Sequence, residues 1–301
     1  MSKKRKSAST KSSKPPRARK TTSKRAPSPR RALSAATNSR KGVNERVRAM
    51  PDASRALCHD DKGFQAMLKV LRDRGEPIQV RLAALASLQA ASFSVVAFES
   101  CRSDYTAALR EVVDDPNPEL RQRVLGLLAR EKDGYAQKRL LEGLENPAKA
   151  LLPPEKALQL LGYDVHADAY RLARKIVDKP PSEIAKREAL RLLAADTSAK
   201  PVFEKILSDK NEAPEYRQIS AAALHAIAPD SLQRQARSIL LDSSESDEIQ
   251  ATSLTAITQF GDNKAVAEDN ELMKRVDRLS AGTPSAKVKQ SAKRFLSKYG
   301  Q

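Results

Sequence analysis

The sequence predicts an all-α fold, a right-handed superhelical solenoid of about seven helical hairpins preceded by a disordered basic tail. An amphipathic helix recurs along the chain at spacings of 31 to 40 residues, a period typical of helical repeat arrays. Ala and Leu dominate these helices, whereas the chain holds only ten Gly, six Tyr, six Phe and no Trp. Net positive charge is concentrated in the first 41 residues, which hold fifteen Lys or Arg and no Asp or Glu.

The repeating unit is clearest in residues 117–130, with the sequence NPELRQRVLGLLAR. Asn117 is a good N-cap, and Pro118 suits the first helical position, where its missing N–H costs nothing. Large aliphatic residues then recur at the spacing of one helix face, at Leu120, Val124, Leu127 and Leu128. The segment therefore predicts an amphipathic helix, the second helix of a hairpin.

Equivalent second helices are found by aligning one small or branched residue, the anchor, in every repeat. The anchors are Ala84, Val124, Ala157, Ala189, Ser220, Ser253 and Ala292. A large aliphatic residue stands four positions after each anchor, at Leu88, Leu128, Leu161, Leu193, Leu224, Ile257 and Leu296. Because positions four apart share a helix face, this column predicts the core of the array.

A first helix is expected before each second helix, over residues 63–74, 103–114, 135–145, 166–178, 199–208, 230–242 and 264–280. Proline stands a few residues before six of the seven anchors, where it ends a turn and begins the second helix. The expected organisation is a disordered tail over 1–41, a short helical junction over 42–61 and the solenoid over 62–301.

Several second helices share a hydrophobic-Arg-x-x-small pattern, in Val80-Arg81, Leu120-Arg121 and Tyr216-Arg217, and Gly261-Asp262 follows Phe260. In these residues the chain resembles HEAT repeats, an armadillo-like helical family, and in particular the short HEAT-like form of phycobilisome-lyase-type proteins. The resemblance implies an α-solenoid that serves as a scaffold for protein binding, and it permits a lyase-type enzyme as an alternative.

The column three residues before the anchors holds Arg81, Arg121, Pro154, Lys186, Arg217, Gln250 and Lys289, so Pro154 and Gln250 depart from the basic pattern. This column could bind phosphate. We expect it instead to form a structural ladder with acidic turn residues of neighbouring repeats, such as Asp114 or Asp209. A second candidate for binding is a basic patch on the second helices, formed by Arg123, Lys156, Arg187 and Arg191; the alternative is an ordinary solvated face.

The tail holds one large aliphatic residue besides Met1, namely Leu33, so it cannot bury enough apolar surface to offset its ordering entropy. A mobile polycation releases counterions from a phosphate backbone, which predicts nucleic-acid binding without sequence preference. The candidate binding residues are Lys3, Lys4, Arg5, Lys6, Lys11, Lys14, Arg17, Arg19, Lys20, Lys24, Arg25, Arg30, Arg31, Arg40 and Lys41.

Two short motifs in the tail resemble known signals. Lys3-Lys4-Arg5-Lys6 matches the basic pattern of nuclear import signals, so the tail could serve only as an address. Ser28-Pro29-Arg30-Arg31 resembles the Ser-Pro-basic motif of linker-histone tails, which makes Ser28 a candidate phosphorylation site.

No nucleophile elbow, phosphate loop or zinc signature occurs in the sequence, and Cys58 and Cys101 are too few for a disulfide framework. We therefore expect no catalytic residue, metal, cofactor or small-molecule substrate, and no membrane span. The expected function is that of a non-enzymatic adaptor whose solenoid binds a partner protein while the tail contacts nucleic acid. We expect it to be intracellular and soluble, in the nucleus or nucleoid, with the cytoplasm as the alternative. The alternatives are a pure protein scaffold with a targeting tail, and the lyase-type enzyme.

Overall fold

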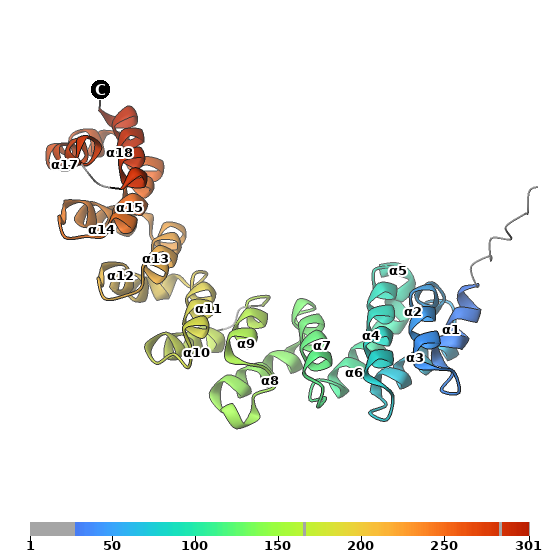
Figure 1. The fold of residues 1–301 in the computed structure, drawn as a ribbon. Helices are drawn as coiled ribbons and strands as arrows, with labels where there is room; N and C mark the ends of the chain where they lie inside the picture. Colours follow the sequence, from blue (N-terminus) through green and yellow to red (C-terminus); the bar gives the residue numbers. More distant parts are fainter. Residues whose placement is uncertain (1–27, 165–166, 283–284, 301) are drawn as a thin grey trace, which may run out of the picture.

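The computed structural model describes residues 28–164, 167–282 and 285–300, which form a curved array of antiparallel helix hairpins (Figure 1). The described residues contain eight hairpins and no strand: α1 (Pro29–Thr37) with α2 (Val43–Leu57), α3 (Asp61–Arg72) with α4 (Ile78–Ser92), α6 (Arg102–Glu111) with α7 (Pro118–Arg130), α8 (Gly134–Glu145) with α9 (Pro154–Leu161), α10 (Ala167–Asp178) with α11 (Glu183–Leu193), α12 (Lys200–Ser208) with α13 (Pro214–Ile227), α14 (Pro229–Leu241) with α15 (Asp247–Phe260), and α17 (Asn270–Ala281) with α18 (Ala286–Tyr299). The predicted all-α solenoid is confirmed.

In most hairpins the second helix lies on the inner side of the arc and the first helix on the outer side, whereas α1 lies at the N-terminal end of the arc beside α2 (Figure 1). Short helices and 3-10 turns fill the connections: α5 (Val95–Phe98), α16 (Asn263–Ala267), η1 (Glu99–Cys101), η2 (Pro147–Lys149) and η3 (Thr197–Ala199). The single helix expected over 264–280 is therefore wrong, because Asp269 caps a new helix there by accepting a hydrogen bond from the Leu272 N–H.

Side-chain caps begin many of the helices, as the sequence indicates. Asn117 accepts a hydrogen bond from the Leu120 N–H at 3.0 Å, which satisfies one of the free donors at the start of α7. The same geometry is found at Asp60, Asp133, Ser182, Asp262 and Ser285. These caps fix where each helix starts and so keep the register of the repeats.

The predicted core column is buried in six of its seven positions, from Leu88 to Ile257, with at most 2 % of each side chain exposed. Leu296 is only partly buried, and Phe295 takes its place beneath α18. Lys293, next to the last anchor, is exposed, in contrast to the apolar residues at that position in other repeats. The register of the second helices is therefore as predicted, except at the last core position.

The boundary expected for the tail, residue 41, is wrong, because α1 folds within it. Leu33 is 2 % exposed, and it lies so close to α3 that a Cβ atom on Gly63 would stand 2.3 Å from its Cδ2. Ala32 and Ala36 lie on the same buried face of α1. The first 41 residues contain no other large aliphatic residue except Met1, but apolar side chains of α2 and α3 pack against Leu33. The expected junction over 42–61 is likewise the second helix of a full hairpin.

Candidate interaction surfaces

A buried arginine near the start of three second helices bridges each hairpin to the next one. Arg46, Arg81 and Arg217 are each the fourth residue of their helix and are 2 to 4 % exposed. In each case the Nε–H donates, at 2.9 to 3.0 Å, to the carbonyl oxygen ten residues earlier, in the last turn of the first helix: Ala36, Leu71 and Leu207. These carbonyls have no partner within their own helices, so the arginines close the helix ends.

The same guanidinium groups bind a carboxylate in the turn of the following hairpin. The pairs are Arg46 with Glu76 at 2.6 Å, Arg81 with Asp115 at 2.5 Å and Arg217 with Glu245 at 2.6 Å. Each acid stands two or three residues before the next second helix begins. We call this row of bridges the arginine ladder. Hydrogen bonds from Arg217 hold the pKa of Glu245 below its ordinary value, so the acid is ionised in the fold.

The structural interpretation of this column is therefore confirmed, although the expected acids are not the ones used. Asp114 pairs with the exposed Arg74 at 3.1 Å, one residue away from the ladder acid Asp115. Asp209 accepts a hydrogen bond from the Asn211 N–H. The sequence could locate the acidic turns but could not say which carboxylate points inward.

Two other members of the column make weaker versions of the bridge. Arg121 donates to the carbonyl oxygens of Leu151, in the next hairpin, at 2.6 Å and of Asp115 at 2.7 Å. Lys186 pairs with Glu212 of the next hairpin at 2.7 Å. Gln250 donates to the carbonyl oxygen of Glu245 at 2.8 Å, within its own hairpin, so it forms no bridge. The ladder thus extends along most of the array.

The ladder is interrupted in the fourth hairpin. Helix α9 has only eight residues and begins at Pro154, three residues before the buried anchor Ala157. Helix α4, by comparison, begins six residues before its anchor, so α9 lacks about one turn at its start. Pro154 therefore stands where the arginine belongs. Pro181 stands two residues before α11, where the acid belongs. A proline side chain can neither donate nor accept a hydrogen bond, so the bridge cannot form here.

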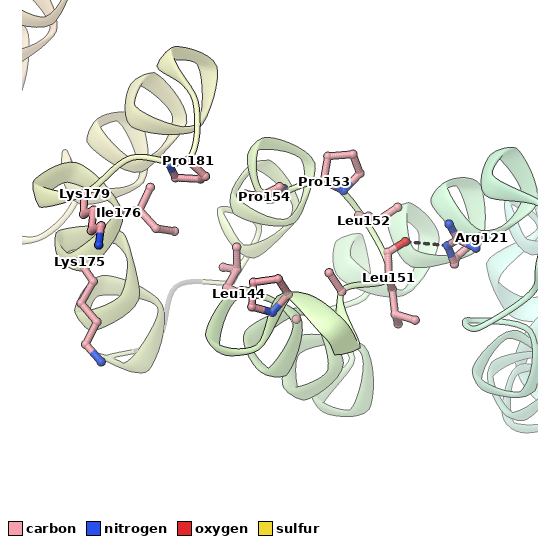
Figure 2. Close-up of a pocket in the computed structure, with 13 residues that line it drawn as sticks. Arg121, Leu144, Leu151, Leu152, Pro153, Pro154, Lys175, Ile176, Lys179 and Pro181 are labelled. Atoms are coloured by element: carbon pink, nitrogen blue, oxygen red, sulfur yellow. Dashed lines mark hydrogen bonds between the residues drawn. The ribbon is translucent and has the colours of Figure 1, made fainter.

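A groove of about 640 Å³, which we call the ladder-gap groove, lies at this interruption (Figure 2). One wall comes from Leu144 and the turn that leads to Pro154; the other comes from the end of α10, with Lys175, Ile176 and Lys179, and from Pro181. Leu144 stands ten residues before Pro154, at the position whose carbonyl accepts the arginine in the regular hairpins. No acidic residue of the described chain lines the groove.

A second set of ion pairs, which sequence reasoning missed, joins successive first helices. The pairs are Arg110 with Asp133, Arg174 with Asp196, and Arg237 with Asp269. Each acid also accepts a hydrogen bond from a backbone N–H at the start of the next helix or 3-10 turn. In the sequence, the only sign of these pairs is an Asp directly before each of the three helices or turns. Many cations of the solenoid are thus engaged in ion pairs between its own helices.

Most members of the predicted basic patch are paired with a carboxylate. Three of its members have an acidic partner: Arg123 pairs with Glu119 at 2.6 Å, Arg187 with Glu215 at 2.5 Å and Arg191 with Glu188 at 2.8 Å. The fourth, Lys156, donates to Gln159 at 3.2 Å. A phosphate would have to compete with these carboxylates, so the alternative of a solvated face fits the geometry better.

Most of the candidate nucleic-acid-binding residues, from Lys3 to Arg25, lie outside the described residues. Arg30 and Arg31 are exposed on α1, and Arg40 is exposed in the turn that follows it. Lys41 pairs with Glu45 at the start of α2. Ser28 is the exposed N-cap of α1, with Pro29 at the first helical position.

An exposed apolar surface, also missed by sequence reasoning, lies at the N-terminal end of the arc. Phe93, directly after α4, and Val95 and Val96, at the start of α5, are 78, 62 and 92 % exposed. A shallow apolar groove of about 320 Å³ lies between α2 and α4, lined by Met50 and Ala86 among others. The sequence pattern favours one long helix that reaches about Phe98, but α4 ends at Ser92 and the apolar residues that follow are exposed.

The cysteine and histidine residues form no reactive site in the described chain. Burial, with a contribution from Cys101, raises the pKa of the Cys58 thiol, so it is a weak nucleophile. His225 is half-buried and stacks on Phe260, with ring centroids 3.5 Å apart. His166 lies outside the described residues. Among the residues placed by the structure, no group of three or more His, Cys, Asp or Glu could hold a metal ion.

No single helix of the described chain has the length and apolar character needed to cross a membrane. One sharply bent pair, Ile78–Ser92 with Val95–Glu111, passes the same test of length and composition. Both helices of that pair belong to the hairpin array and contribute buried residues to its core.

Comparison with known proteins gives no family for this chain. No protein-family model matches it, and no curated protein matches it in sequence. Among solved structures, the chain is similar to human deoxyhypusine hydroxylase in complex with glycerol, with 16 % sequence identity and a TM-score of 0.34. The likeness covers 83 % of this chain and 99 % of that one. At such identity it concerns helical architecture alone.

This comparison also corrects the expectation that the chain is not an enzyme. Deoxyhypusine hydroxylase is an enzyme by its name, and its helical chain is matched over almost its whole length. The absence of a familiar catalytic motif does not establish a purely binding role. Fold and function are separate questions for such arrays.

Proposed function

We propose that the solenoid binds a partner protein while the basic N-terminal segment binds nucleic acid without sequence preference. The observation that carries the proposal is the distribution of unpaired charge. Many cations of the array are held in ion pairs, in the arginine ladder and between the first helices. Residues 1–27 hold eleven Lys or Arg and no acidic residue, so no carboxylate within the segment can neutralise them.

The exposed apolar surface around Phe93 and Val96 supports the protein-binding half of the proposal. Large apolar side chains are common singly on protein surfaces, but several exposed ones close together in the chain are typical of interaction sites. Binding at this surface leaves open a catalytic activity elsewhere on the array.

The nucleic-acid half is tested with fluorescently labelled duplex DNA titrated at several salt concentrations. The proteins are the full chain, a chain that starts at Ser28, and a peptide of residues 1–41. If about half of the fifteen charges meet phosphates, log affinity should fall with log salt at a slope of roughly −6 to −7. A scrambled DNA sequence should bind equally well, since base readout requires placed side chains.

The three proteins distinguish the alternatives. The peptide should keep most of the slope, and the chain starting at Ser28 should bind weakly. Equal affinity of that shortened chain would move the site to the solenoid. Failure of the full chain to bind at low salt would favour the targeting role of the basic segment.

The protein-binding half is tested by proximity labelling in cells. The double variant Phe93→Ser/Val96→Ser should lose a defined set of labelled proteins, because it removes the exposed apolar surface without touching the core. Tyr135→Ser, which removes a 43 % exposed side chain on the outer helix α8, is the matched control. Identical labelling by all three proteins would contradict a partner at this surface.

A further inference from the structure

We propose that the ladder-gap groove binds a segment of the partner protein that carries an acidic side chain beside aliphatic ones. This inference rests on the proposed protein-binding role of the solenoid and assigns one contact within it. The starting point is an internal comparison, because the same chain builds the equivalent position several times. In the regular hairpins an arginine and a carboxylate of the chain fill it, and in the fourth hairpin they do not.

In the regular hairpins the space between successive turns is closed by the chain itself. A buried arginine and a buried carboxylate fill it, as in the Arg81–Asp115 pair, whose side chains are 4 % and 1 % exposed. In the fourth hairpin the late start of α9 removes one turn of helix, and prolines occupy both ladder positions. The groove is the space left by a missing ion pair.

The charges at the groove are of one sign. Lys175 and Lys179 are both exposed, and neither ammonium group lies within ion-pair distance of a carboxylate in the described part of the chain. Arg121 also lines the groove, and two of its nitrogens are satisfied by backbone carbonyls. A ligand that supplies a carboxylate would pair with these cations, as the chain's own Asp and Glu residues pair with arginines in the regular hairpins.

The walls between these cations are apolar. Leu144, Ile176, Pro154 and Pro181 offer aliphatic surface, so a purely ionic ligand would leave most of the groove uncovered. An aliphatic side chain next to an acidic one satisfies both features. The basic N-terminal segment of this chain has the wrong charge to occupy the groove.

The inference is tested by selecting short random peptides, displayed on phage, against the full chain. A soluble peptide of residues 1–41 is added in excess, so that acidic peptides held only by the basic segment are removed. The enriched peptides should place Asp or Glu next to Leu, Ile, Val or Pro. Their affinity is then measured by fluorescence anisotropy.

The exposed double variant Lys175→Glu/Lys179→Glu should weaken binding of the enriched peptides about tenfold or more, because attraction becomes repulsion. Lys287→Glu/Lys293→Glu, on the exposed surface of the last hairpin, changes the net charge equally and should leave binding unchanged. Pro181→Glu supplies the missing ladder acid from the chain itself and should also weaken binding.

Two results would overturn the inference. One is that the enriched peptides carry no acidic residue, and the other is that they bind the Lys175→Glu/Lys179→Glu variant as tightly as the parent. If their binding is instead lost in Phe93→Ser/Val96→Ser, the groove assignment fails while the proposed protein-binding function stands. If no peptide is enriched and proximity labelling finds no partner, both fail.

Discussion

The arginine ladder makes a quantitative prediction for Arg217→Ala. The Arg217 side chain donates three hydrogen bonds of 2.6 to 2.9 Å, one to the Leu207 carbonyl and two to the carboxylate of Glu245. Both charged side chains are 3 % exposed. Truncation removes the cation and leaves a buried carboxylate and a helix-end carbonyl without partners.

The cost follows from the burial of the partner that remains. Removing one member of a buried ion pair costs about 3–5 kcal/mol, because the other charge stays desolvated and uncompensated. Arg74→Ala is the matched control, since Arg74 and Asp114 are 61 % and 58 % exposed. An exposed pair of this kind contributes only about 0–1 kcal/mol.

The assay is urea unfolding followed by circular dichroism, together with hydrogen exchange resolved by helix. In a repeat array the loss should concentrate in α12 to α15, the two hairpins that the bridge joins. The double variant Arg217→Met/Glu245→Met removes both charges, so it should lose only the roughly 1–3 kcal/mol of the unpaired Leu207 carbonyl. A loss below about 1 kcal/mol for Arg217→Ala would refute the buried bridge.

The same bridge predicts how stability depends on pH. Hydrogen bonds from Arg217 lower the pKa of Glu245 below its ordinary value of 4.5, so the folded state holds the carboxylate more tightly ionised than the unfolded chain does. The contribution is therefore complete above pH 4.5 and is lost as the pH falls through the lowered pKa. The difference in stability between the parent and Arg217→Ala should narrow over that acidic range.

Three further perturbations test other parts of the structure. Leu193→Ala removes a fully buried side chain from the core column and should cost about 2–5 kcal/mol in urea unfolding; a loss under about 1 kcal/mol would contradict the register. Tyr299→Phe deletes the hydroxyl that donates to the Ile257 carbonyl at 2.8 Å and should cost about 0.5–1.5 kcal/mol, with faster exchange confined to α15 and α18. Ser28→Glu places a negative charge at the start of α1, so it should stabilise that helix by about 0.3–1 kcal/mol while it weakens DNA binding at moderate salt. Unchanged DNA affinity of this variant would contradict the idea that a phosphate at Ser28 weakens DNA binding.

The fold could be predicted from the sequence because its signal is repeated. Each copy of the anchor and of the aliphatic residue four positions later supports the others, so the register held from Leu88 to Ile257. A single copy carries no such support. Helix α1 was missed because it has one large aliphatic residue, Leu33, whose apolar neighbours come from helices distant in sequence.

The candidate sites were less predictable, because they depend on which side chains meet. The sequence showed Pro154 and Pro181 only as helix starts and turns, and the groove between them exists because both fall on ladder positions. The pairing within the basic patch depends in part on such contacts. Arg187 and its acid, Glu215, lie on different helices, and their ion pair becomes visible only when the hairpins stack.

The interruption of the ladder has a mechanical consequence for the array. On its N-terminal side, Arg46, Arg81 and Arg121 tie each hairpin to the next through buried or half-buried bonds, and Lys186 and Arg217 do the same on its C-terminal side. Between the fourth and fifth hairpins this tie is missing, so bending stiffness should be lower there than between the tied hairpins on either side. The solenoid should bend more easily at this joint, and a chain stretched in optical tweezers should yield there before the tied hairpins do.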